Sequence, residues 1–198
     1  MVLYDLELSG NCYKIRLMIA FLGLDCELKA IDFLGGEHKE DAFAAMNPFC
    51  EIPVFEDEGL TLRDSQAILI YLARKYGGEA WLPTMPDGLA RVMQWLSTAS
   101  NDLARGPNDA RLHDLFGYDI NVDLARRKAH LTLSIIENHL KDKEWLELGR
   151  PTIADIACFP YIALGHEGGV ALDGYPAIRS WIERIKNIPS FVAMPGLA

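Results

Sequence analysis

Hydrophobic residues follow two different periods along the first 76 residues of the chain. Short apolar runs at 2–6 and 26–31 predict two strands, because continuous apolar stretches of this length are typical of a buried sheet. Between these runs, apolar side chains recur on one helical face: Ile15, Met18, Ile19 and Leu22. Gly23 then predicts the end of that helix.

A hairpin and a further helix complete this first part. The segments 53–55 and 60–62 have strand character, and the acidic, glycine-containing stretch 56–59 between them predicts a tight turn. Asp64 and Ser65 then open a helix with an apolar stripe of its own: Ile68, Tyr71, Leu72 and Tyr76. Strand, helix, strand, hairpin and helix in this order predict an α/β domain over residues 1–76. It would hold a small mixed sheet flanked by helices.

The remainder of the chain has only helical periodicity. Residues 77–88 are rich in glycine and proline and predict a linker. Helical spacing follows at 89–115, 121–141, 152–166 and 175–187, so residues 89–198 should form an all-α helical bundle domain. Thr152 and Asp155 have the spacing of a capping box. The helix after them is apolar on almost every side, which indicates the buried centre of the bundle.

Composition narrows the class of protein. The chain has 198 residues, half of them hydrophobic, which is enough for one sizeable domain or two small ones. It has no apolar run of about eighteen residues, and its start lacks the basic and apolar pattern of a secretory signal. Four scattered cysteines lack metal-binding spacing and suit a reducing compartment: Cys12, Cys26, Cys50 and Cys158. We therefore expect a cytoplasmic protein.

The charge is acidic and unevenly distributed. The net charge is −9, and residues 1–80 carry seven basic and fourteen acidic side chains, a balance of 7 − 14 = −7. This excludes nucleic acid as the expected partner, since nucleic acid requires a basic face. An anion bound by the first domain would depend on local donors rather than on the overall field.

Three motifs in this order give the chain a family resemblance. They are Ser9-Gly10-Asn11-Cys12 after the first strand, the pair formed by 47–53 and 64–68, and 152–155 in the second half. Together they resemble the glutathione S-transferase family, in its bacterial cytosolic, serine-type or beta-like form, over nearly the whole chain. The resemblance implies a thioredoxin-like glutathione-binding domain followed by a helical domain. It implies a homodimeric detoxification enzyme that transfers the thiolate of glutathione, its co-substrate, to small electrophiles. It implies no metal or other cofactor.

Two residues compete for the catalytic role that the resemblance implies. Ser9 matches the serine whose hydroxyl stabilises the glutathione thiolate, although a serine here could also be an ordinary helix N-cap. Cys12 matches the cysteine of beta-class enzymes, but could equally be a small half-buried residue. Ser9 replaces the first cysteine of a CxxC motif, so an internal disulfide cannot form there. Asn11 could donate its amide to the same sulfur or serve only as a loop residue.

The resemblance also assigns glutathione-binding roles in the middle of the domain. Pro53 matches the cis-proline that turns the backbone N–H and C=O of Ile52 toward the tripeptide, and a strand-start proline is the alternative. Two neighbours depart from the family pattern. Many relatives have glycine in place of Cys50, and lysine or glutamine in place of Glu51. Glu51 cannot act as a cationic clamp.

Three further residues match the ends of the tripeptide. Asp64 would face the α-ammonium group and Ser65, at a helix start, would receive the γ-glutamyl carboxylate, unless both only cap the helix. His38 matches a histidine aimed at the glycyl carboxylate, although a loop histidine is usually just solvated.

The acceptor pocket should lie between the two domains. Candidates for its lining are Trp95, Asn101, Arg105, Asn108 and Phe116. Two other functions remain open. One is a glutathione-dependent disulfide or peroxide reductase, or an isomerase, using Cys12. The other is a non-catalytic interaction protein on the same fold.

Overall fold

The first 72 residues form a four-stranded mixed sheet with helices on both faces. The structure, a computed structural model, describes residues 1–197. Its first elements are β1 (Val2–Asp5), α1 (Gly10–Leu22), β2 (Glu27–Ala30), α2 (Asp41–Met46), β3 (Val54–Asp57), β4 (Leu60–Arg63) and α3 (Ser65–Leu72). The strand order is β2-β1-β3-β4, with β2 parallel to β1 and the other pairs antiparallel. The mixed sheet is therefore confirmed, as are the helix ending at Gly23 and the hairpin turn. The short helix α2 was not predicted.

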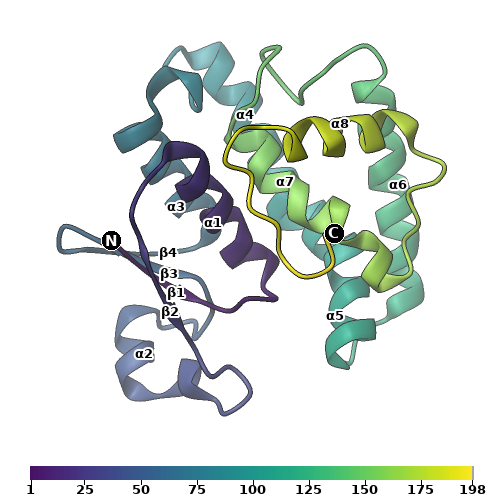
Figure 1. The fold of residues 1–198 in the computed structure, drawn as a ribbon. Helices are drawn as coiled ribbons and strands as arrows, with labels where there is room; N and C mark the ends of the chain where they lie inside the picture. The colour runs from purple at the N-terminus through teal and green to yellow at the C-terminus, as the bar shows by residue number, and fades with distance from the viewer. Residues whose placement is uncertain (198) are drawn as a thin grey trace.

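The two faces of the sheet belong to different cores. Successive side chains of a strand point to opposite faces, so Leu3 and Phe55 join the main core while their neighbours Tyr4 and Val54 join a smaller one with Phe43 of α2. In Figure 1, α1 and α3 lie between the sheet and the helical half of the chain, and α2 lies on the far side. The face covered by α1 is thus the face that meets the second half.

The second half is helical throughout. Its elements are α4 (Pro86–Thr98), the π-helical segment η4 (Ala99–Asn108), α5 (Asp109–Phe116), α6 (Val122–Leu140), α7 (Ile153–Ala163) and α8 (Pro176–Lys186). Short turns of helix complete the chain: η1 (Glu37–Lys39), η2 (Ala73–Gly77), η3 (Gly78–Ala80) and η5 (Gly165–Gly168). The predicted helical regions are confirmed, but the first begins earlier, because Pro86 is tolerated in a first helical turn, and contains an unpredicted π segment. None of the described helices is long and apolar enough to cross a bilayer.

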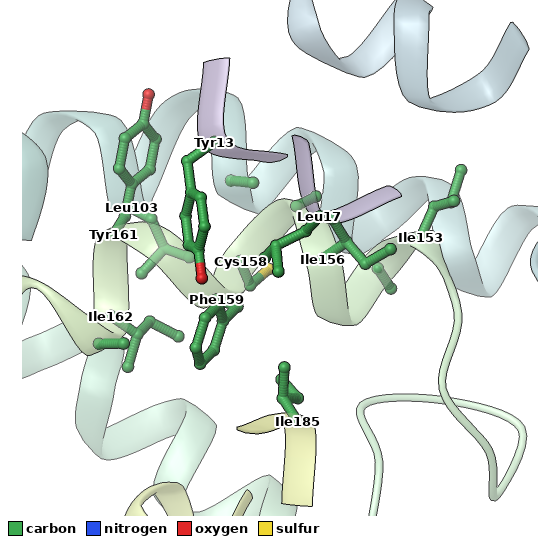
Figure 2. Packing of buried hydrophobic residues seen from close by; sticks show 14 of the residues in the cluster. Tyr13, Leu17, Leu103, Ile153, Ile156, Cys158, Phe159, Tyr161, Ile162 and Ile185 are labelled. Carbon is green, nitrogen blue, oxygen red and sulfur yellow. The ribbon is translucent and has the colours of Figure 1, made fainter. Parts of the chain in front are cut away.

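Helix α7 is the centre of the molecule, as its sequence predicted. Every residue from Ile153 to Ala163 is buried, and the capping box of Thr152 and Asp155 is present. Figure 2 shows Tyr13 of α1 above Phe159 of α7, with ring centroids 6.3 Å apart. The hydrophobic core is therefore continuous from the sheet half into the helical half.

Candidate active site

A cavity of about 560 Å³ lies between the sheet half and helices α5 and α7. It brings together five of the predicted site residues: Ser9, Asn11, His38, Glu51 and Ile52. The other predicted residues, Cys12, Pro53, Asp64 and Ser65, do not line it. A larger hollow of about 910 Å³ runs along α8, but none of the predicted site residues borders it. The smaller cavity is therefore the candidate active site.

Ser9 has the geometry of both of its predicted roles. It is the N-cap of α1, and its Oγ accepts a hydrogen bond of 3.2 Å from the backbone N–H of Cys12. Because the oxygen acts as an acceptor in this bond, the hydroxyl hydrogen can still be donated, either to the nearby Cys12 side chain or into the cavity. Ser9 is half-buried at the cavity wall, so this hydrogen can reach a bound anion.

Cys12 does not have the environment of a reactive thiol. Its side chain is fully buried and does not reach the cavity. Burial raises the pKa of the Cys12 thiol to about 12, although a hydrogen bond with Ser9 opposes the shift. A thiol that stays protonated and is closed to solvent is a poor nucleophile. This environment favours the alternative of a small packing residue, and the catalytic role of Cys12 stays a prediction.

Asn11 lies at the centre of a hydrogen-bond cluster that the sequence did not predict. Its Oδ1 accepts from Lys14 Nζ at 2.8 Å, Ser65 Oγ at 3.0 Å and Tyr161 OH at 2.8 Å. Lys14 is only 1 % exposed, and desolvation lowers its pKa to about 7. Burial raises the pKa of Tyr161 far above its ordinary value. The cluster joins α1, α3 and α7 at the edge of the cavity.

The loop before β3 is shaped by Asn47, another buried residue that the sequence analysis did not single out. The Nδ2 of Asn47 donates to the Glu51 carbonyl at 2.6 Å, and its Oδ1 accepts from Phe49 N at 3.0 Å. Cys50 has φ of 53°, in the left-handed region that glycine adopts most readily. The peptide bond between Ile52 and Pro53 is cis, as the resemblance implied. Ile52 borders the cavity beside exposed Glu51.

Asp64 and Ser65 both have hydrogen-bond partners within the protein. The Oδ1 of Asp64 accepts from the backbone N–H groups of Gln66 and Ala67 at 2.9 and 3.0 Å, so Asp64 caps α3. The Ser65 hydroxyl is buried and donates to Asn11. The backbone N–H of Ser65 stands at the first position of α3, where helix N–H groups have no intrahelical acceptor.

His38 is buried rather than solvated. Its ring stacks on Phe33 with centroids 3.9 Å apart, and burial and Lys39 lower its pKa. Its Nδ1 has no hydrogen-bond partner among the described residues. His38 lines the cavity, although its unpaired Nδ1 is itself buried.

Two of the five residues predicted for the acceptor side line the cavity, namely Asn108 and Phe116. Trp95, Asn101 and Arg105 do not line it.

Arg111 is a further cavity residue, and the sequence analysis did not predict it. It is buried, pairs with Glu167 and donates to the Leu8 carbonyl at 2.9 Å, which ties α5 to the loop after β1.

Comparisons with known proteins agree with this architecture. The family described as the glutathione S-transferase N-terminal domain matches residues 3–80, and that of the C-terminal domain matches residues 116–189. Maleylacetoacetate isomerase of Pseudomonas aeruginosa is 30% identical over 96% of this chain and 93% of its own length. Glutathione S-transferase theta-1 of Mus musculus is 30% identical over 90% of this chain and 79% of its own.

Solved structures have the same fold. The glutathione S-transferase from Pseudomonas fluorescens superposes with a TM-score of 0.92 at 34% identity, and covers 98% of each chain. A glutathione S-transferase from Xanthobacter autotrophicus superposes with a TM-score of 0.89 at 28% identity, and the match covers 99% of this chain and 97% of that one. The chain therefore belongs to the glutathione S-transferase family, with a thioredoxin-like first domain and a helical second domain.

Proposed function

We propose that this transferase joins the thiolate of glutathione to small electrophiles held in the cavity between its two halves. The observation that carries the proposal is the Ser9 hydroxyl, which can donate a hydrogen bond and belongs to a residue that lines the same cavity as Ile52. Glutathione would lie along the backbone of Ile52 as an added strand, with its sulfur near Ser9. The carbon–sulfur bond then forms as the thiolate attacks. The displaced group leaves, or a proton adds to the acceptor.

Ser9 is the main stabiliser of the thiolate in this proposal. A free thiol of the cysteine type has a pKa near 8.5, and lowering it by about two units requires only ~2.7 kcal/mol. A hydroxyl donor at a helix start can supply this, and the unpaired N–H groups of α1 add their dipole. The amide of Asn11 is a second donor on the same wall.

The remaining predicted residues would bind the rest of the tripeptide. The Ser65 N–H group at the start of α3 is suited to the γ-glutamyl carboxylate, and the hydroxyl can join it by turning from Asn11. Asp64, which caps α3 beside Ser65, would face the ammonium group. His38, which lines the cavity, would face the glycyl carboxylate. Pro53 would keep Ile52 in place. Glu51 would contribute backbone contacts only, because its carboxylate cannot attract an anion.

An isomerase is the second candidate function. The P. aeruginosa relative named maleylacetoacetate isomerase supports it. In such a reaction the same thiolate would add to an unsaturated acceptor and leave again, so glutathione would be recovered unchanged. A disulfide or peroxide reductase has less support, since Cys12 is buried and its pKa is raised. Product analysis by mass spectrometry separates the two candidates. A transferase yields a glutathione conjugate, whereas an isomerase yields an isomer of the acceptor and consumes no glutathione.

We further infer a cytoplasmic, homodimeric detoxification enzyme with domains at 1–76 and 89–198, joined by 77–88. Four free cysteines support a reducing compartment. Large apolar side chains remain exposed on both halves, including Phe49 at 61 % and Met85 at 72 %. Such side chains support burial against a second copy. Glutathione is the only co-substrate that the proposal requires, and it requires no metal.

Calorimetry with glutathione tests the proposal directly. The wild-type protein should bind glutathione, and Ser65→Ala should weaken binding at least several-fold, because a charge-assisted hydrogen bond contributes roughly 1.5–3 kcal/mol. Wild-type protein that gives no heat of binding at millimolar glutathione would overturn the proposed function.

A further inference from the structure

Lys14 is a fully buried cation in α1 that takes part in none of the ion pairs among residues 1–197. Its Nζ donates to Asn11 Oδ1 at 2.8 Å and lies 4.1 Å from the centroid of the Tyr161 ring. Burying a charge without a carboxylate partner is costly. Packing alone therefore does not explain why a lysine occupies this position. The hydrogen-bond acceptor of Lys14 is Asn11, which belongs to the candidate active site.

The cluster determines which way the Asn11 amide faces. An ammonium group can only donate hydrogen bonds, so the amide atom opposite Lys14 must be the oxygen. The hydroxyls of Ser65 and Tyr161 reach the same oxygen. Because the amide is planar, its Nδ2 points away from these three donors. Among the described residues, the polar side-chain atoms that are both fully buried and unpaired belong to His38, Gln66 and Arg111. The Nδ2 of Asn11 is not among these atoms, so it is accessible to a ligand. Asn11 lines the cavity together with Ser9, so its free donor faces that space.

We propose that Lys14 is a positioning residue for the transfer reaction, which holds the Asn11 oxygen inward so that Nδ2 donates to the sulfur of bound glutathione beside Ser9. The inference rests on the proposed function, because it requires a glutathione thiolate at Ser9. Lys14 itself does not touch glutathione. It acts through Asn11, and Ser65 links the same oxygen to the start of α3, where the γ-glutamyl end would bind.

The charge of Lys14 determines how strictly the amide is held. The groups that face it are Asp64 before α3, Cys158 and Tyr161 on α7, and Asn11 on its own helix. Burial lowers the pKa of Lys14 to about 7, so the ammonium form predominates only below that pH. A neutral amine has a lone pair and can also accept a hydrogen bond. Above that pH, Lys14 therefore no longer excludes the flipped orientation of Asn11, in which Nδ2 faces Lys14. A thiolate nearby favours the ammonium form and extends the range in which the amide is fixed.

The experiment compares Lys14→Met with Lys29→Met. Methionine has a similar length and is apolar, so it suits a buried site but cannot donate. Lys29 is the matched control, because its Nζ also lies over a tyrosine ring, 4.9 Å from the centroid of Tyr4, but it is exposed on β2 away from the cavity. The readouts are the pKa of bound glutathione, followed by thiolate absorbance against pH, and kcat and KM for glutathione.

For Lys14→Met we expect the pKa of bound glutathione to rise by about one unit and kcat near pH 6.5 to fall about tenfold, with KM within about twofold. Lys29→Met should match the wild type. Asn11→Asp keeps the oxygen that accepts three donors but removes Nδ2. It should raise the thiol pKa at least as much, with no fall in melting temperature. A folded Lys14→Met protein with wild-type thiol pKa and kcat would overturn the inference.

Two further results have their own interpretation: misfolding of Lys14→Met, and a wild-type protein that does not bind glutathione. If Lys14→Met does not fold, Tyr161→Phe removes one donor from the same oxygen and keeps the ring; it should raise the thiol pKa by a smaller amount, and an unchanged value would count against the inference. Wild-type protein that binds no glutathione would reject the proposed function itself. An active wild type with an unaffected Lys14→Met rejects only the role of Lys14.

Discussion

Ser9 and Cys12 are three residues apart at the start of α1, and the structure gives them opposite environments. Ser9 is half-buried at the cavity, while Cys12 is closed to solvent. We therefore expect Ser9→Ala to lower the conjugation rate by about ten- to a thousand-fold, since one donor to the developing charge is lost. The pKa of bound glutathione should rise in parallel, which absorbance titration measures.

Cys12→Ala is the comparison for this prediction. Because the Cys12 thiol is protonated and does not reach the cavity, its removal should leave conjugation within a few-fold of the wild type. An inactive Cys12→Ala together with a nearly normal Ser9→Ala would reverse the assignment and favour the reductase function.

Lys14 should make the stability of the protein depend on pH. Burial lowers the pKa of Lys14 to about 7 in the folded state, below the ordinary value of 10.5. Between these two values the unfolded chain binds more protons, so the contribution of Lys14 to the free energy of unfolding rises with pH across this window. Below about pH 7 its destabilising effect is complete.

Lys14→Met removes this dependence. The variant should be more stable than the wild type at pH 6, and the difference between the two should shrink toward pH 9. Urea unfolding at both values measures it. A difference that does not change with pH would mean that Lys14 keeps its ordinary pKa in the folded protein.

At the scale of elements, the capping box of α7 supports more than its own helix. The buried carboxylate of Asp155 accepts from Thr152 N at 2.9 Å, from Leu146 N at 3.0 Å and from Trp181 Nε1 at 2.9 Å. These bonds join α7 to the loop before it and to α8. Asp155→Ala leaves three buried donors without a partner, so the free energy of unfolding should fall by roughly 3–5 kcal/mol.

Chemical denaturation of Asp155→Ala tests this role of α7. Asp123 is the control, an exposed acid in the first turn of α6, and Asp123→Ala should change stability by less than about 1 kcal/mol. Equal effects of the two substitutions would show that the buried contacts of Asp155 contribute little.

Hydrophobic periodicity identified the strands and the long helices, but it missed the short helices and the π segment. The strands and long helices bury one face each, and this requirement places apolar residues at regular intervals in the sequence. Helix α2 (Asp41–Met46) is too short for such a stripe, and only Phe43 is buried from it. The π segment η4 follows α4 without a break but has a different hydrogen-bond pattern, which hydrophobic spacing does not report.

For the whole molecule, the contact between its halves places the active site. Gly10 opens α1, and a Cβ there would lie 2.9 Å from the Tyr161 ring, which is closer than side-chain atoms pack. Gly10→Ala should therefore push α1 away from α7 and shift both Ser9 and Asn11. We expect a loss of about 1–3 kcal/mol in stability and a clear loss of conjugation.

Gly174→Ala is the matched control for Gly10→Ala. A Cβ at Gly174 meets no atom within 4 Å, so stability and rate should both stay near the wild type. Thermal unfolding and initial rates give the comparison. Full activity of Gly10→Ala would show that the halves can move apart without disturbing the site.

The sequence by itself determined the order of elements, the capping box of α7 and the candidates Ser9, His38 and Ile52. The order of elements and the capping box follow from local spacing, whereas the three candidates follow from the resemblance of the motifs to the family. Tertiary structure alone decided that Cys12 is buried, that Asn11 accepts three donors, one of them Lys14, and that Tyr161 and Arg111 line the cavity. The reason is physical. Burial, and with it the pKa of a side chain, depends on which segments distant in sequence pack against it, and around Asn11 these are α3 of the same half and α7 of the opposite half.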